Sequence, residues 1–245
     1  MVSNEKLEQP SVELTGVDRW IFLISEHWML LFSLFYGIWI LLPFLAPVLM
    51  KTGWRTPGKA IYAVYTLFCH QLPQRSFFLF GPEFTYSLAE IGNAWKPTTN
   101  PGVLREFLGS AEMGWKVAWS DRMVSMYSSV LLMSWVWWPL RNRIKQLSMK
   151  GLFLFLLPMG IDGGTHMISD LQGLGEGFRY HNQWLAEMTG HVFKSGFYAG
   201  TTWGTFNSGM RLLTGILFGV GFVWYLFPLL DDAFQDLKTS TRQGK

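Results

Sequence analysis

Long apolar runs separated by polar segments dominate this chain, and they predict membrane-spanning helices. Residues 28–50, 123–140 and 212–230 contain no charged side chain. A helix needs about 20 mostly apolar residues to cross a hydrocarbon core of roughly 30 Å, because each residue rises about 1.5 Å. We therefore expect spanning helices over about 28–50, 121–140 and 211–230.

A fourth apolar run, residues 151–170, predicts another span that polar side chains interrupt. Asp162 and His166 break the run, and Pro158 with its neighbouring glycines should distort the helix. Ionisable residues inside a span are rare, because leaving water costs free energy, and they often mark a functional site. This segment is therefore expected to be both a span and part of a site.

Residues 60–82 are ambiguous, because Pro73 follows only about 13 residues of regular helix. The basic residues favour a crossing. Half of all Lys and Arg residues lie in segments 51–59, 141–150 and 232–245, and such residues accumulate on the cytoplasmic side of a membrane. The three segments share one side only if 60–82 crosses, which predicts five spans. A four-span bundle with a re-entrant 60–82 is the alternative.

These elements predict an all-α fold, a polytopic transmembrane bundle of about five helices. Residues 1–27 form an N-terminal extramembrane segment, 28–231 the transmembrane domain and 232–245 a cytoplasmic tail. The outer connections, 83–120 and 171–210, are too long for simple turns and are expected to carry short helices. The expected location is the cell membrane (inner or cytoplasmic), with the N-terminus outside and the C-terminus in the cytoplasm.

Composition agrees with a membrane protein and excludes several other classes. Charged residues make up 15% of the chain and hydrophobic residues 49%, whereas about a quarter of the residues in soluble domains are charged. The formal net charge of +3 gives no reason to expect a nucleic-acid partner. A single cysteine, Cys69, excludes a disulfide framework and a four-thiolate zinc site within one chain.

On the predicted topology, polar residues from four helices meet near the outer leaflet. Asp162, His166 and Asp170 follow one another at intervals of four residues, so they lie near one face of their helix. Buried charges of this kind pair with one another or line a water-filled cavity. The candidate site residues are Cys69, His70, Arg75, Arg122, Asp162, His166, Arg211 and Thr214.

The residue types in this group are typical of anion binding and proton transfer. Guanidinium groups bind phosphate or carboxylate through paired hydrogen bonds, and histidine exchanges a proton near neutral pH. The candidate anion-binding residues are Arg75, Arg122, Arg211 and Thr214. The candidate catalytic residues are His70, Asp162 and His166.

Two other interpretations of the group stay open. In the first, the group is structural: Asp162 balances Arg122 or Arg211 and fixes the helix register without chemistry. In the second, a divalent metal is the cofactor, held by histidine and aspartate with a thiol as a soft extra ligand. The weak metal-ligand candidates are Cys69, His70, Asp162 and His166. No complete ligand motif is present, so no cofactor is assigned.

Several short motifs resemble a known family. Residues Cys69–Ser76 read Cys-His-Gln-Leu-Pro-Gln-Arg-Ser, and Pro158–Gly163 and Arg211–Gly215 form two further blocks. Over roughly residues 60–230 the chain resembles the prokaryotic multi-pass membrane proteins catalogued as domain of unknown function 2085. In that family the first block is Cys-His-Gln-x-Pro-x-Arg-Ser.

One further block departs from the family pattern. The family has two cysteines flanking an arginine, followed by a tyrosine, whereas Ser120–Tyr127 keeps Arg122 and Tyr127 without either cysteine. Those cysteines imply a metal or redox role in relatives that have them, and their absence counts against that role here. The family carries no activity, so the resemblance implies membership and site location only.

Three function classes stay open. The first is binding or processing of an anionic lipid or isoprenoid phosphate headgroup, with or without catalysis by a histidine. The second is an accessory or scaffolding subunit of a larger membrane complex, such as a bioenergetic one, in which the polar group is structural. The third is a small transporter. The expected partners are membrane lipid and, through the loops 83–120 and 171–210, other membrane subunits.

Overall fold

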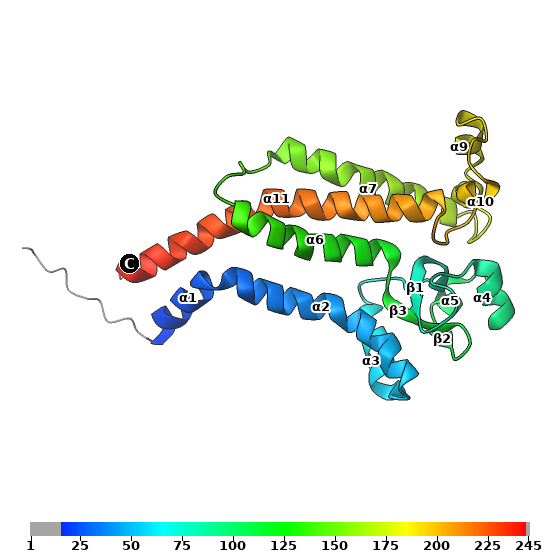
Figure 1. Ribbon diagram of the computed structural model, residues 1–245, viewed down its shortest axis with the longest axis horizontal. Coiled ribbons are helices and arrows are strands. Elements are labelled where there is room, and N and C mark those ends of the chain that lie inside the picture. The colour runs from blue at the N-terminus through cyan, green and yellow to red at the C-terminus, as the bar shows by residue number, and fades with distance from the viewer. Residues whose placement is uncertain (1–15, 244–245) are drawn as a thin grey trace, which may run out of the picture.

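The computed structural model describes residues 16–243 of the chain. Within this part four long helices lie alongside one another (Figure 1): α2 (Trp28–Lys51), α6 (Asp121–Leu140), α7 (Met149–Asp170) and α11 (Phe206–Gln243). Helix α11 packs against both α6 and α7, and α2 packs against α6. Four of the five predicted helices are therefore present.

Three of these helices are long and apolar enough to cross a membrane. In residues 16–243 the candidate spans are α2, α7 and α11. Helix α6 has 20 residues but is not among these candidate spans, because serine and tryptophan residues lower its hydropathy. The structure thus supports a mostly helical membrane protein with candidate spans, as predicted in outline.

Residues 60–82 do not form a spanning helix, which corrects the five-span prediction. Helix α3 (Arg55–Tyr65) ends early, and a short 3₁₀ helix, η1 (Pro73–Arg75), and strand β1 (Ser76–Leu79) follow. Two residues prevent a continuous helix here: Gln71 has a left-handed backbone with φ of 51°, and Pro73 has no N–H to donate. The structure has the four long helices of the alternative prediction.

The charge argument failed because the basic segments do not share one end of the bundle. Segment 51–59 lies at one end, whereas 141–150 and the last turns of α11 lie at the other (Figure 1). Lys51, Arg55 and Lys59 are all exposed. The Lys and Arg residues that appeared to mark one side are therefore divided between both.

Both ends of the described chain lie at the same end of the bundle (Figure 1). Helix α1 (Gly16–Glu26) packs along α11, where Lys238 Nζ lies 3.0 Å from Glu26 Oε1. This arrangement favours one side of the membrane for both ends of the described chain, whereas the predicted orientation of the termini themselves stays a prediction. Residues 1–15 of the predicted N-terminal segment 1–27 lie outside the described residues.

The opposite end of the bundle carries both long connections. The first contains a three-stranded antiparallel sheet in the order β1-β3-β2, which the sequence analysis did not predict. Its other elements are α4 (Leu88–Ala94), α5 (Pro101–Leu104), β2 (Gly109–Ser110) and β3 (Gly114–Ser120). The second connection contains α8 (Phe178–His181), α9 (Gln183–Met188) and α10 (Ser195–Tyr198). The fold is thus mostly helical rather than all-α.

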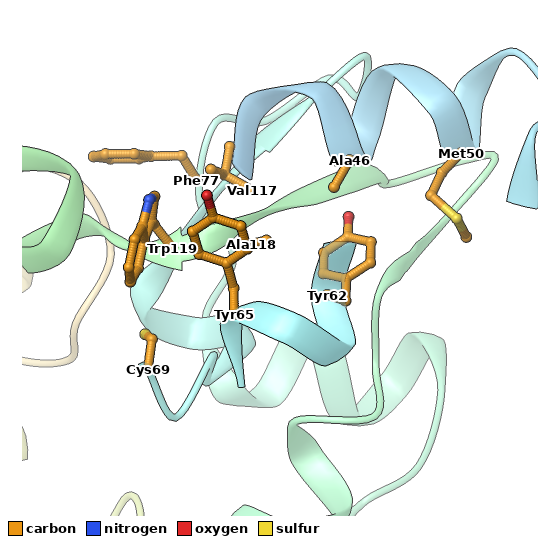
Figure 2. Close-up of a cluster of buried hydrophobic side chains, with 9 residues drawn as sticks. All are labelled: Ala46, Met50, Tyr62, Tyr65, Cys69, Phe77, Val117, Ala118 and Trp119. Atoms are coloured by element: carbon orange, nitrogen blue, oxygen red, sulfur yellow. The ribbon is translucent and has the colours of Figure 1, made fainter. Parts of the chain in front are cut away.

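An aromatic core joins the sheet to α2 and α3 (Figure 2). Tyr62, Tyr65 and Trp119 are buried there, and the Tyr65 and Trp119 rings meet edge to face with centroids 4.8 Å apart. The Tyr65 hydroxyl donates to the carbonyl oxygen of Trp39 at 2.7 Å, and burial raises the pKa of Tyr65 to about 12. This core fixes the position of Cys69, which lies at its edge.

Helices α6 and α11 approach closely through small residues. A Cβ added at Gly219 would lie 2.0 Å from Ser129 Oγ, and Ser129 Oγ donates to the carbonyl oxygen of Gly215 at 3.2 Å. Small residues permit such close packing in membrane bundles. This close packing of α6 on α11 also brings Asp121, at the start of α6, next to Arg211 of α11.

Candidate functional site

Ion pairs join the long helices to the second connection, at the end of the bundle that carries the sheet. Asp162 of α7 accepts hydrogen bonds from Arg122 Nη2 at 2.6 Å and from Arg179 Nη2 at 2.5 Å. The approach of Arg122 requires a glycine in α7, because a Cβ at Gly163 would lie 2.8 Å from Arg122 Nη1. The predicted pairing of Asp162 with Arg122 is present. One carboxylate thus holds α6, α7 and α8 together.

A second ion pair links α6 to α11. Arg211 donates through Nε and Nη2 to the Asp121 carboxylate at 2.6 to 2.9 Å. Arg211 Nη2 also donates to the carbonyl oxygen of Thr201 at 2.7 Å. Both charged side chains are only 3% exposed, so each depends on the other for the interactions that water would otherwise provide. This pairing replaces the expected alternative of Arg211 with Asp162.

A third ion pair links η1 to the end of α7. Arg75 donates to both oxygens of Asp170 at 2.6 and 2.8 Å, and to the Tyr180 hydroxyl at 3.0 Å. Burial by itself lowers the pKa of Arg75, but the bonds to Asp170 and Tyr180 outweigh it and raise the pKa above its ordinary value. Arg75 is therefore held as a cation.

His166 is held by one of the same arginines. Its Nε2 lies 3.2 Å from Arg179 Nη2. Because a guanidinium only donates, Nε2 must accept, and the imidazole proton is assigned to Nδ1. Nδ1 is buried and has no hydrogen-bond partner in the described part of the chain. Asp162 Oδ1 is 3.9 Å from Nε2, which is too far for a hydrogen bond. His166 is thus an acceptor that positions Arg179.

A cavity of about 680 Å³ lies beside these ion pairs. Arg75, Arg122 and Arg211 line it, together with Asp121 and Asp170. Its volume is in the range of cavities that hold small ligands. Apolar side chains complete the wall: Leu72, Met123, Met167, Leu171 and Leu174. The cavity therefore offers both cationic and apolar surface to a ligand.

The structure brings most of the predicted site residues to this cavity. Those that line it are Cys69, His70, Arg75, Arg122, His166 and Arg211. Asp162 lies behind the arginines and is 3% exposed. Thr214 does not line the cavity, because its hydroxyl donates at 2.8 Å to the carbonyl oxygen of Met210 in its own helix. Thr214 is thus placed with α11, away from the predicted anion site.

The weak metal-ligand candidates do not converge in the described part of the chain. Residues 16–243 contain no group of three or more His, Cys, Asp or Glu side chains placed to hold a metal ion. Asp162 already binds two arginines, and Cys69 Sγ accepts from the Gln71 backbone N–H at 3.4 Å. His70 is exposed. The described residues therefore do not form an assembled ligand set, and the metal interpretation stays a prediction.

Two buried basic residues were missed by the sequence analysis. Arg179 lies in a polar loop whose sequence shows no periodicity that would link it to Asp162. Lys116 of β3 is 0% exposed, and its Nζ donates at 2.8 Å to the carbonyl oxygens of Gln71 and Arg105. Burial lowers the pKa of Lys116 to about 7. The available signal was a lysine within the otherwise apolar strand sequence Gly-Trp-Lys-Val-Ala-Trp.

A family model matches part of the chain. Residues 112–225 match the family described as Predicted membrane protein (DUF2085). The resemblance predicted from the motifs is confirmed over this region. The DUF2085 region contains Arg122, Asp162 and Arg211, whereas the Cys69–Ser76 motif lies before it. Together with the candidate spans, the match identifies a membrane protein.

One curated protein is similar to most of the chain. Over 212 residues the chain is 24% identical to the Uncharacterized protein MJ1492 of Methanocaldococcus jannaschii. The alignment covers 83% of this chain and 93% of the relative. No solved structure gives a significant match. The comparisons therefore supply a similarity without an activity, and the site itself must carry the functional argument.

Proposed function

We propose that the arginine-lined cavity binds the phosphate headgroup of an anionic lipid or an isoprenoid phosphate. The observation that carries the proposal is an excess of arginine donors. Four arginines form ion pairs with three aspartates in the described cluster. Within residues 16–243 the buried Nε atoms of Arg75, Arg122 and Arg179 have no hydrogen-bond partner, and neither does the buried Nη1 of Arg211. A phosphate would supply both the missing charge and the missing acceptors.

The aspartates support this function by positioning the arginines. Asp121, Asp162 and Asp170 each bind an arginine at 2.6 Å or less. An anion therefore meets guanidinium groups that are already oriented, and little side-chain entropy is lost on binding. The cluster thus has the properties of a preorganised anion-binding site, with one more arginine than aspartate.

The apolar wall favours a lipid over a free anion. Met167 of α7 and Leu171, the residue after α7, line the cavity and are also 65% and 83% exposed. Helix α7 is a candidate span. A hydrocarbon chain attached to a bound headgroup can therefore leave the cavity over these two residues and enter the bilayer.

If the protein also processes its ligand, His70 is the first candidate for the proton transfer. His166 is engaged by Arg179, whereas His70 lines the cavity, is exposed, and has no hydrogen bond or ion pair within residues 16–243. An imidazole with both ring nitrogens available can accept and donate a proton in acid–base catalysis.

The proposal is tested by lipid binding to full-length protein in nanodiscs, measured by native mass spectrometry with dioleoylphosphatidic acid as the probe. Arg122→Gln should reduce retention at least about tenfold, because a hydrogen bond to a charged group contributes about 1.5–3 kcal/mol. Asp162 keeps Arg179 in this variant, so the bundle should still assemble. An excess of inorganic phosphate should compete if the headgroup alone supplies the affinity.

Arg141→Gln is the matched control. Arg141 lies at the other end of α6, with its guanidinium 4.0 Å from the centre of the Trp138 ring. Its loss should leave phosphatidic acid binding unchanged. Equal retention by the two variants, or equal binding of phosphatidylcholine and phosphatidic acid by the wild type, would refute a headgroup site at the cavity.

An accessory subunit of a membrane complex is the second candidate function. Its support is that each aspartate of the cluster already has an arginine partner, as a purely structural network requires. Gentle detergent extraction separates the two functions. A hetero-oligomer that persists without bound anionic lipid supports the subunit, and a lone bundle that retains lipid supports the headgroup site.

A further inference from the structure

Residues 178–198, which contain α8, α9 and α10, form an arm at the cavity end of the bundle. Figure 1 shows the arm running crosswise to the long helices, beside the ends of α7 and α11. A segment in this position lies at the level where a candidate span leaves the hydrocarbon core. Its exposed side chains therefore meet either water or the headgroup layer.

The arm exposes a set of large apolar side chains. Trp184 is 45% exposed, Met188 70%, Val192 74% and Phe193 50%. These values do not reflect a missing core, because Leu185 and Ala186 of the same helix are buried against Tyr198. The arm thus has a packed interior of its own and a separate apolar surface.

Helix α9 divides its residues between three faces. Trp184 and Met188 are four positions apart and share one face. Gln183 and Glu187 share the next, where the Gln183 amide donates to the Glu187 carboxylate at 2.9 Å. The third face holds the buried residues. A short helix with separate polar and exposed apolar faces is suited to a boundary between water and a less polar phase.

The exposed apolar face is connected to the membrane helices. The Trp184 ring centroid lies 6.1 Å from that of Phe206, the first residue of α11. Because Met188 shares the face of Trp184, this face adjoins the start of a candidate span. At the same end of the bundle, Ile168 of α7 and Leu171, directly after α7, are 55% and 83% exposed.

We propose that the apolar face of the arm is seated in the interfacial layer of the bilayer, in the leaflet that adjoins the cavity. Tryptophan is enriched at this depth, because its ring is apolar and its N–H is polar. Lys194 is exposed directly after Phe193, where it can meet lipid phosphates. The occupant is therefore a lipid surface, and the seated arm keeps Arg179 at Asp162.

The test uses single-cysteine variants, since Cys69 is the one cysteine of the sequence. In a Cys69→Ala background, spin labels are placed through Met188→Cys and Val192→Cys, with Glu187→Cys as the matched control on the polar face. The proteins are reconstituted in phosphatidylcholine and phosphatidylglycerol vesicles, and collisions with oxygen and with a water-soluble nickel chelate are measured.

Labels at 188 and 192 should collide at least about twofold more with oxygen than with the chelate, relative to the label at 187, because oxygen concentrates in lipid. Chelate access equal to that at 187 would place the face in water and overturn the proposal. Shielding from both reagents would also overturn it, because a protein would then cover the face.

A second measurement avoids the change at Cys69. Tryptophan fluorescence of the otherwise wild-type chain is quenched with brominated lipids, and the quenched fraction is compared with that of Trp184→Phe. The fraction should fall when Trp184 is removed. An unchanged fraction would mean that this ring does not reach the lipid, which is incompatible with the proposal.

Discussion

At the scale of single residues, substitution of Asp162 should lower the free energy of unfolding most, because its carboxylate binds two arginines. Asp162→Asn removes the charge that Arg122 and Arg179 share. Breaking a buried ion pair on one side typically costs about 3–5 kcal/mol. We expect a loss of that order in the free energy of unfolding, measured by denaturant titration in detergent.

Asp170→Asn provides the comparison for this prediction. Asp170 is 24% exposed, and its partner Arg75 keeps a bond to Tyr180. The loss should therefore be clearly smaller than for Asp162→Asn. Equal losses of unfolding free energy for the two variants would show that the second arginine bound to Asp162 adds nothing to stability.

The burial of Lys116 should make the stability of the protein depend on pH. Burial lowers the pKa of Lys116 to about 7, whereas in the unfolded chain the pKa is about 10.4. Between these values the unfolded state binds more protons than the folded state, so stability rises with pH by about 1.4 kcal/mol per unit. The rise should begin near pH 7 and end near pH 10.

Lys116→Met should remove this rise, because methionine does not titrate. The measurement is denaturant unfolding in detergent from pH 7.5 to 9.5, with exposed Lys194→Met as the control that should keep the wild-type slope. Parallel slopes for wild type and Lys116→Met would contradict a depressed pKa at this lysine.

The sequence predicts those parts of the site that lie close together along the chain, and it misses those that distant segments bring together. Asp162 and His166 are four residues apart, and their common face follows from helix geometry alone. Arg179 and Lys116 are buried through contacts between segments that no local pattern links. Local spacing therefore found the centre of the cluster and missed the partner supplied by the loop.

At the scale of elements, the packing of α11 on α6 depends on the absence of a side chain at Gly219. Gly219→Ala would place a methyl group 2.0 Å from Ser129 Oγ and 2.8 Å from the backbone nitrogen of Val130. Overpacking of this kind costs about 1–3 kcal/mol. We expect a lower unfolding midpoint in detergent.

Gly160→Ala is the matched control within a long helix. A Cβ at Gly160 would have no neighbour within 4 Å, and alanine favours a helix by up to about 1 kcal/mol relative to glycine. This variant should be as stable as the wild type or more so. Destabilisation by both changes would attribute the effect to helix flexibility rather than to the α6 contact.

The element predictions succeeded where hydrophobicity alone decides and failed where a turn decides. Runs such as 28–50 predicted helices because a span needs only length and apolar side chains. Residues 60–82 are similarly apolar, but the backbone of Gln71 and the ring of Pro73 divide them. The sheet was missed because its strands pair across a long connection, from Ser76 to Ser120.

At the scale of the whole molecule, the fold predicts that both termini lie on one side of the membrane. The end that carries α1 and the last turns of α11 also carries segment 141–150, with Arg141, Arg143, Lys145 and Lys150. Since such residues accumulate in the cytoplasm, we predict that both termini are cytoplasmic and the cavity faces outward.

Reporter fusions at the two termini measure this orientation. A fluorescent protein, active in the cytoplasm, and an alkaline phosphatase, active outside it, are fused in turn to each terminus. Both termini should give fluorescence and neither should give phosphatase activity. Opposite results at the two ends would contradict the four-helix arrangement.

The ion pair between Asp121 and Arg211 has a consequence for how the polypeptide is made. Its partners are 90 positions apart in the sequence, so translation at 5–20 residues per second leaves the carboxylate waiting for on the order of ten seconds. Until the ribosome delivers the last hydrophobic segment, the nascent chain holds an uncompensated acid near the lipid. The arrival of Arg211, near the start of the final helix, is thus the event that neutralises it. Products truncated before this residue should be recognised by quality-control proteases.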